Sequence, residues 1–209
     1  SRHPALHEIT IQLTRKFLRM ASTIDLKLPL QNGMRGVQLE TAKSVATDGW
    51  NTTLTLYSHC GTHMDAPRHF INDGAGIEHV SLETCIGPAK LINLTPVHPR
   101  ELFTVDRLGS EARNIVKGDR LLLRTDWSHR HGSAAWRDEL PRIDASLARW
   151  FVEREVALIG VEPPSVADVN NRDELTTVHR ILFEAGIVIV EGLTNLDKLP
   201  STFDLVVLP

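Results

Sequence analysis

The chain carries many short apolar runs separated by turn-forming and polar residues, which is the pattern of a strand-rich protein. The runs that contain β-branched and aliphatic side chains predict strands at Ile24–Leu30, Thr53–Ser58, Ala89–Leu94, Arg120–Thr125, Val156–Val161 and Ile187–Val190. Polar and apolar side chains alternate along Thr53–Ser58, so we expect that strand to be half-buried.

Helical spacing of apolar residues is rarer. It predicts helices at Pro99–Leu108, Asp144–Arg154 and Thr176–Glu184, with Asp144 as the N-cap of the second. The last of these stops at Gly186, and an apolar run follows at once. The order predicts a β-rich α/β domain in which a twisted sheet or partial barrel carries peripheral helices.

Composition is that of an ordinary globular protein. The chain has 209 residues, of which 42% are hydrophobic and 23% charged, enough for one substantial core. We therefore expect a single domain over residues 22–209, preceded by an N-terminal extension over residues 1–21. No apolar run reaches the roughly 18 residues of a membrane span, and the first residues lack the apolar centre of a secretory signal, so we expect a cytoplasmic protein without membrane contact.

The charge gives no reason to expect a nucleic-acid partner. The formal net charge is −3, and lysine and arginine are scattered without a basic stripe, so a small-molecule substrate is more natural. The two cysteines, Cys60 and Cys85, are not expected to form a disulfide inside a cell. Cys60 adjoins a candidate ligand and could be a thiolate ligand or nucleophile, although a small buried side chain is the favoured interpretation.

Residues 59–69 read His-Cys-Gly-Thr-His-Met-Asp-Ala-Pro-Arg-His and hold the densest candidate chemistry. Any one of these histidines alone is more typical of a surface or hydrogen-bonded core residue. Together, three imidazoles and a carboxylate are costly to bury as bare groups, whereas Zn²⁺ or Mn²⁺ accepts such ligands at about 2.0–2.2 Å. We therefore predict that at least His59, His63 and Asp65 bind one divalent metal ion.

The spacing places these ligands where a strand ends. His59 and His63 are four apart, as in helical zinc motifs, but Gly61 lies between them and Pro67 follows Asp65, which disfavours a helix. Pro67 is expected to stiffen the exit of this turn.

A second candidate pair stands near the C-terminal end of the sequence. His179 lies in the last predicted helix, and Glu191 ends the apolar run Ile187–Val190. From the residues alone, Glu191 is either a solvated strand terminus or an inward carboxylate that needs a cation.

The segment 59–69 matches every fixed position of HxGTHxDxPxH, and the chain resembles the metal-dependent hydrolases of the cyclase family, which include bacterial kynurenine formamidases and isatin hydrolases. Leu121–Ser128 and Gly160–Leu196 look like its central strand and C-terminal stretch. The resemblance implies the swivelling β/β/α type of fold and a homo-oligomer, dimer or tetramer. It also implies that His179 and Glu191 complete a two-metal site bridged by Asp65, which leaves His69 as the acid/base that passes a proton to the leaving amine.

Two positions depart from the family pattern. Kynurenine formamidases usually carry a Trp-Pro-Gly-type sequence after the opening strand, whereas this chain has Gly33-Met34-Arg35-Gly36-Val37-Gln38 and lacks the stacking aromatic residue. Arg35 or Gln38 could contact a polar or anionic substrate there, or the segment could be a solvated loop. Glu162 stands where relatives commonly have aspartate.

These residues predict metal-assisted hydrolysis of a small amide, as in arylformamidases of tryptophan catabolism, with one or two divalent ions, Zn²⁺ or Mn²⁺. A related hydrolase that opens a cyclic amide or lactone would use the same set of site residues. A non-catalytic metal-binding module is the third possibility, and it would require a closed ligand set.

Overall fold

A computed structural model describes residues 22–208, so the N-terminal extension predicted for residues 1–21, and Pro209, lie outside the described residues. The strands are β1 (Val37–Lys43), β2 (Trp50–Leu56), β3 (His63–Asp65), β4 (Ile86–Asn93), β5 (Leu102–Phe103), β6 (Arg120–Arg124), β7 (Arg142–Ile143), β8 (Leu158–Val161), β9 (Val188–Glu191) and β10 (Thr202–Val206). The α-helices are α2 (Leu82–Cys85), α3 (Ala134–Asp138), α4 (Ala145–Glu153) and α5 (Arg172–Glu184). Short 3₁₀ helices are η1 (Pro67–His69), η2 (Ile77–His79), η3 (Val105–Asn114), η4 (Trp127–Arg130) and η5 (Leu196–Lys198).

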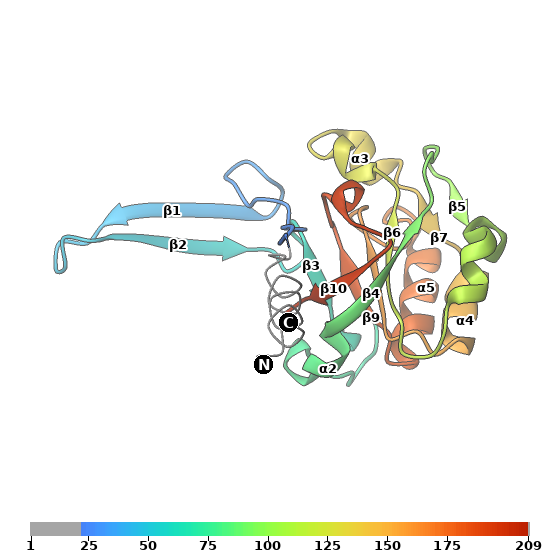
Figure 1. Cartoon of the computed structure of the whole chain (residues 1–209). Coiled ribbons are helices and arrows are strands. Elements are labelled where there is room, and N and C mark those ends of the chain that lie inside the picture. The colour runs from blue at the N-terminus through green and yellow to red at the C-terminus, as the bar shows by residue number, and fades with distance from the viewer. Residues whose placement is uncertain (1–21, 209) are drawn as a thin grey trace, which may run out of the picture.

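The body of the protein is built on a six-stranded sheet with the order β10-β4-β6-β8-β9-β3 (Figure 1). The four inner strands are parallel, and the two outer strands, β10 and β3, run antiparallel to their neighbours. Inner parallel strands are covered on both faces, which explains why the sequence of β8, Leu-Ile-Gly-Val, is buried throughout. The predicted β-rich α/β fold is confirmed, with an open sheet as its form.

Alternate side chains of the sheet enter two separate cores. Leu121, Leu123 and Ile189 point to one face, where they pack with residues of α4 and α5. Leu122 and Val190 point to the other face, where they pack with Leu193, Leu196 and neighbouring residues. Figure 1 shows α4 and α5 together on one side of the sheet. From that side, His179 of α5 comes within 3.6 Å of Asp65 on the edge strand β3.

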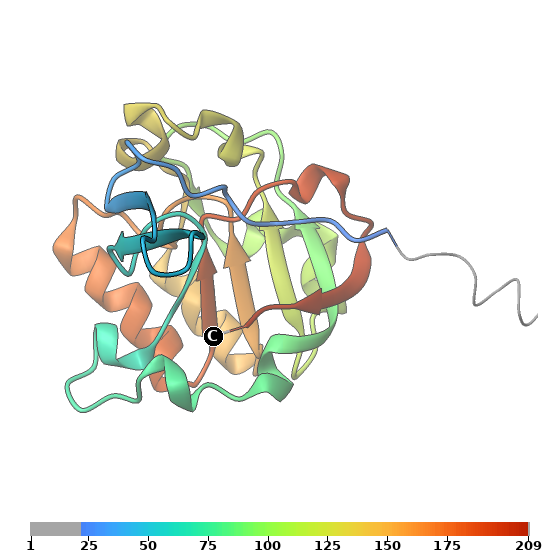
Figure 2. The ribbon, with the colours of Figure 1, turned by 90° about the vertical axis from the view of Figure 1, so that its left-hand side faces the viewer.

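Strands β1 and β2 form a separate two-stranded sheet that projects from the body (Figures 1 and 2). Every residue of β2 is exposed. The half-buried strand predicted at Thr53–Ser58 is therefore a strand, but the prediction of burial was wrong, because among residues 22–208 the strand pairs with β1 alone and its side chains remain exposed. We call this hairpin, residues 37–56, the arm.

Three of the remaining predicted elements differ in the structure. Ile24–Leu30 forms no strand, since its backbone makes only isolated hydrogen bonds: Leu28 N donates to Thr62 Oγ1 at 2.8 Å, and Leu26 O accepts from Thr194 N at 3.0 Å. Pro99–Leu108 is not a helix, because Leu102–Phe103 pairs with β7 before η3 begins. The helix predicted from Thr176 starts earlier, at Arg172, where the Asn171 side chain caps it by accepting from Glu174 N.

The other predicted strands and the helix capped by Asp144 are confirmed, each with ends shifted by no more than a few residues. Among the residues that the structure describes, no helix has the length and apolar character needed to cross a membrane.

Candidate metal centre

The register of the sheet edge brings three of the predicted ligands onto one face. In the antiparallel pair β3–β9, His63 lies opposite Glu191 and Asp65 lies opposite Ile189. Residues that lie opposite each other share a face of the sheet, and so do residues two apart on one strand. The side chains of His63, Asp65 and Glu191 therefore all point toward α5. Met64 points the other way and packs against the second core.

Close backbone approach sets this edge in place. Gly192 follows β9 with φ of 69°, and a Cβ at this position would lie 2.5 Å from the carbonyl oxygen of Gly61. Thr62 Oγ1 donates to the carbonyl oxygen of Gly192 at 2.5 Å, which ties the turn before β3 to the end of β9. Gly61, the glycine of the motif, has a φ of 59° and presents its carbonyl to Gly192, so both positions favour glycine.

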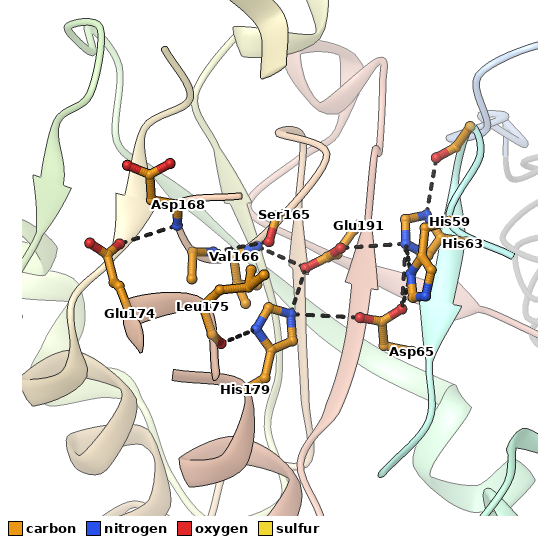
Figure 3. A network of polar contacts seen from close by, with 12 residues as sticks. His59, His63, Asp65, Ser165, Val166, Asp168, Glu174, Leu175, His179 and Glu191 are labelled. Carbon is orange, nitrogen blue, oxygen red and sulfur yellow. Dashed lines mark hydrogen bonds and ion pairs between the residues drawn. The ribbon is translucent and has the colours of Figure 1, made fainter. Parts of the chain in front are cut away.

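The five predicted ligands meet in one cluster (Figure 3). His59 Nδ1 lies 2.9 Å from Asp65 Oδ1 and 3.1 Å from His63 Nε2. The other oxygen of this carboxylate, Asp65 Oδ2, lies 3.6 Å from His179 Nε2. His179 Nε2 in turn lies 3.4 Å from Glu191 Oε1. Ligands of a tetrahedral zinc ion at about 2.0–2.1 Å lie roughly 3.3 Å apart, so these separations have the scale of a ligand shell.

Backbone carbonyls orient two of the imidazoles. His179 Nδ1 lies 2.7 Å from the carbonyl oxygen of Leu175, one helical turn earlier, and His63 Nδ1 lies 3.2 Å from that of Gly61. An N–H that donates to a carbonyl leaves the opposite ring nitrogen free, and in both residues that nitrogen, Nε2, faces the carboxylates. This is the arrangement in which histidine binds metal ions.

Asp65 gives the clearest sign that a cation belongs here. It is 3% exposed, and neither of its carboxylate oxygens has a hydrogen-bond partner, because the imidazoles approach within ion-pair distance but outside hydrogen-bond geometry. A buried, unpartnered carboxylate is costly, and a divalent cation between it and the ring nitrogens removes that cost. The residues present therefore fit a divalent metal.

The protonation states of the metal-free cluster follow from this crowding. Burial alone would lower the pKa of His63, but the carboxylates of Asp65 and Glu191 raise it to about 10. Burial would also raise the pKa of Asp65, yet His59 and His63 hold it well below its usual range. For His179, the carboxylate of Glu191 outweighs burial and raises the pKa. Protons thus occupy the positions that a metal would take.

Glu191 points inward. It is 2% exposed, so the alternative of a solvated strand terminus is wrong. Its Oε1 accepts a hydrogen bond of 2.8 Å from Val166 N, and its Oε2 lies 3.4 Å from His63 Nε2. Sequence reasoning did not find Val166, because a backbone N–H carries no signature in the residue type.

His69 stands on the open side of the cluster, at the end of η1. It is exposed, and its ring centre lies 4.1 Å from that of His59. Its ligating nitrogen falls in one group with those of His59 and Asp65, all within 4.8 Å of one another, so geometry permits both a ligand and a proton carrier. Burial lowers its pKa, which favours the neutral ring that a proton acceptor needs.

Two aromatic residues flank the open side. Tyr57, the single tyrosine of the chain, has its ring centre 5.4 Å from that of His59, and Phe70 lies 4.2 Å from His69 and 4.5 Å from His179. Sequence reasoning missed both as neighbours of the site. Gln38, proposed there as a substrate contact, instead donates to Glu40 on the arm.

The remaining flagged residues have structural surroundings. Glu162 is 1% exposed and accepts from Thr125 N at 2.6 Å, Thr125 Oγ1 at 2.9 Å and Ser128 Oγ at 2.8 Å, which joins the ends of β6 and β8. Cys60 is a buried free thiol and belongs to neither group of donor atoms found among residues 22–208. The interpretation of Cys60 as a small buried side chain agrees with this placement.

Comparison with known proteins gives consistent likenesses in sequence and in structure. Residues 24–168 match the family model described as "Putative cyclase". The "Kynurenine formamidase" of Bacillus mycoides (strain KBAB4) is 31% identical over 201 residues, which cover 92% of this chain and 91% of that protein.

Solved structures are also similar. Isatin hydrolase A from Ralstonia solanacearum has a TM-score of 0.68 at 25% identity, covering 96% of this chain and 89% of its own. A structure described as a potential metal-dependent hydrolase with cyclase activity has a TM-score of 0.68 at 26% identity, covering 86% and 85% of the two chains.

Proposed function

Because the chain belongs to the cyclase family, we propose that it is a metal-dependent hydrolase that cleaves a C–N bond of a small amide. The observation that carries this proposal is the buried carboxylate of Asp65, whose two unpartnered oxygens face different imidazoles, Oδ1 toward His59 and His63 and Oδ2 toward His179. A structural ion needs one closed set of ligands, whereas two sets that share a carboxylate suit a hydrolytic centre.

In this proposal, Asp65 would serve two divalent ions, Zn²⁺ or Mn²⁺. His59 and His63 would help Asp65 to hold one ion, and His179 and Glu191 would help it to hold the other. Imidazole and carboxylate ligands suit both metals, so availability and coordination geometry select between them.

When bound, the metal would activate water as a nucleophile at neutral pH and polarise the amide carbonyl. The chain itself supplies the proton transfer. His69 is exposed beside His59 and has a lowered pKa, so its neutral ring can accept a proton from the attacking water and return it to the leaving nitrogen. Protonation of the amine makes C–N cleavage possible, because a free amide anion is a poor leaving group.

The surroundings favour an amide with an aromatic group. Tyr57 and Phe70 lie beside the histidines, and they supply aromatic surface although the tryptophan of the family pattern is absent. With a kynurenine formamidase as a relative, the first substrate class to test is a formylated aryl amine, in keeping with a place in tryptophan catabolism. The likeness to isatin hydrolase favours a second candidate, the opening of a cyclic amide or lactone.

A substrate panel separates these functions. Purified protein with Zn²⁺ or Mn²⁺ should be assayed on N-formyl aryl amines, cyclic imides, isatin-type cyclic amides and lactones. We expect the highest kcat/KM on the N-formyl aryl amines. Preference for a cyclic compound would establish the second candidate, and no turnover of any compound by metal-loaded protein would contradict the proposed hydrolase.

The Glu191→Gln variant tests the number of ions. Loss of the carboxylate charge should remove the ion that Glu191 shares with His179, so bound metal should fall from about two ions per chain to about one. Elemental analysis of protein equilibrated with metal and freed of excess measures this. Unchanged metal content would exclude Glu191 as a ligand, whereas a total of one ion in the unaltered protein would exclude the two-metal centre.

Metal binding should release protons. With its pKa at about 10, His63 is protonated in the metal-free protein at neutral pH, and a ligating imidazole must be neutral. Calorimetric titration in buffers of different ionisation enthalpy should therefore show the release of about one proton or more per chain, and apparent affinity should rise as the pH approaches 10. Binding that is independent of both buffer and pH would contradict this protonation scheme.

We also expect the protein to act as a homo-oligomer, a dimer or tetramer, and to work in the cytoplasm. Neither expectation enters the chemistry above.

A further inference from the structure

The two side chains assigned to the second ion, His179 and Glu191, are both oriented by backbone groups. Val166 N donates to Glu191 Oε1 at 2.8 Å, and the carbonyl oxygen of Leu175 lies 2.7 Å from His179 Nδ1. These backbone groups belong to two different segments, the loop after β8 and the first turn of α5 (Figure 3). The geometry of both side chains therefore depends on how this loop and this helix are held together.

A single carboxylate oxygen joins the loop to the helix. Glu174, in the first turn of α5, accepts through its Oε1 a hydrogen bond of 3.2 Å from Asp168 N (Figure 3). Asp168 follows Val166 by two residues, and Glu174 directly precedes Leu175. The bond thus connects the two segments next to the groups that orient His179 and Glu191.

An arginine from a third element holds that carboxylate. Arg142 of β7 donates from Nε to Glu174 Oε1 at 2.6 Å and from Nη2 to Glu174 Oε2 at 3.4 Å. The two side chains are only 13% and 21% exposed, so salt and water screen this pair less than a surface pair. A two-point contact between guanidinium and carboxylate also fixes the direction in which the carboxylate points.

Strand β7 holds the loop through its backbone as well. Ile143, next to Arg142, donates from its N to the carbonyl oxygen of Val166 at 2.9 Å. Val166 is therefore bonded on both sides, to Ile143 through its carbonyl and to Glu191 through its N–H. Arg142 Nη1 also donates to Arg100 O at 2.8 Å, which anchors the arginine to the segment before β5.

We propose that the ion pair between Arg142 and Glu174 positions His179 and Glu191 and thereby strengthens binding of the ion they share. The two residues of the pair are positioning residues. Their bonds are to the loop and to the helix turn, and the backbone groups there orient both ligands. This inference rests on the two-ion centre proposed above.

The other ion should depend much less on this pair. His63 Nδ1 lies 3.2 Å from the carbonyl oxygen of Gly61, in the turn before β3, and His59 precedes that turn. This orienting carbonyl comes from neither the loop after β8 nor α5. A change at Glu174 is therefore expected to weaken one ion selectively, whereas a general loss of structure would weaken both.

Glu174→Ala tests the proposal, with Glu184→Ala as the matched control. Glu184 pairs with Arg180 on the same helix, but the two side chains of that pair are 53% and 54% exposed. In Glu174→Ala we expect the affinity for one of the two ions to fall by on the order of 10- to 100-fold, the usual effect of losing a group that orients a ligand. Titration with Zn²⁺ in competition with a chelating dye measures both affinities, and Glu184→Ala should match the unaltered protein.

Glu174→Gln shows whether the hydrogen bonds, and not the charge, do the positioning. The bonds from Asp168 N and from Arg142 Nε reach the same oxygen, Oε1, so the amide oxygen of glutamine can accept both. We expect this variant to keep most of the affinity that Glu174→Ala loses. Arg142→Ala and the double alanine variant should weaken the same ion to a similar extent as Glu174→Ala, because the two residues act through one contact.

Amide hydrogen exchange of the metal-free protein, measured by NMR, gives a result that depends on neither turnover nor the number of ions. We expect the Val166 amide to exchange slowly in the unaltered protein and in Glu184→Ala, and on the order of 10-fold faster in Glu174→Ala. Faster exchange would show that the pair holds the loop in place.

The outcomes separate this proposal from the two-ion centre. Unchanged affinity for both ions in Glu174→Ala would overturn the proposal, and so would an equal loss for both, since it would give the pair a general structural role. If the unaltered protein held only one ion, the two-ion centre would be wrong. The Val166 exchange rate would then decide: faster exchange in Glu174→Ala would support the positioning role, and an unchanged rate would overturn it.

Discussion

The Asp65→Asn variant is expected to lose bound metal and activity together. Asparagine has nearly the same shape, but its neutral amide cannot balance two cations or offer an anionic oxygen to each of them. Because the nucleophile depends on the metal, kcat/KM on the best substrate of the panel should fall by on the order of 10³-fold or more. Elemental analysis and the hydrolysis assay on the same preparation measure both effects.

Asp204→Asn is the matched control. Asp204 is an exposed aspartate on β10, at the opposite edge of the same sheet, so the same chemical change can be made far from the cluster. We expect it to leave metal content and rate unchanged. If Asp65→Asn kept its full metal content and its rate, Asp65 would have no role in the centre.

For His69→Ala we expect a different pattern, with metal retained and turnover lost. A residue that only carries a proton is not needed to hold an ion, so metal content should persist while kcat falls by on the order of 10²- to 10⁴-fold. The acidic limb of the pH–rate profile should change as well, since it reports protonation of the proton acceptor, which this variant lacks. Loss of metal from this variant would instead make His69 a ligand, which its position beside His59 and Asp65 permits.

His79→Ala is the control for this change. His79 ends the 3₁₀ helix Ile77–His79 as His69 ends Pro67–His69, and its side chain is 67% exposed. The two substitutions thus remove the same side chain from equivalent local structures. An equal loss of rate in both would argue for a general effect on folding.

The inner strands could be predicted from the sequence because their environment is uniform. β6 and β8 are buried on both faces, so unbroken apolar runs mark them. The segment Ile24–Leu30 alternates apolar residues with Asp25, Lys27 and Pro29, which also indicates a strand, yet its backbone partners are the distant Thr62 and Thr194, which no local pattern reveals. The arm has the alternation of a half-buried strand, but nothing in the alternation says whether the covering surface belongs to the same chain.

The metal cluster also has some residues that the sequence alone could predict and others that it could not. His59, His63 and Asp65 are close in sequence, and their residue types alone indicate a metal. The approach of Glu191 depends on the register between β3 and β9, and that of His179 depends on how α5 packs on the sheet. These are tertiary facts, which only the family resemblance could anticipate. Backbone groups such as Val166 N and Leu175 O, which orient Glu191 and His179, have no sequence signal.

The central claim is that hydrolysis by this chain depends on a divalent metal held by the Asp65 cluster. The most direct measurement strips the protein with a chelator, removes the chelator, and follows hydrolysis of an N-formyl aryl amine as Zn²⁺ or Mn²⁺ is titrated back. We predict no turnover without metal and recovery that rises in proportion to bound ion until the cluster is filled. Full activity in protein shown by elemental analysis to hold no metal would contradict the claim.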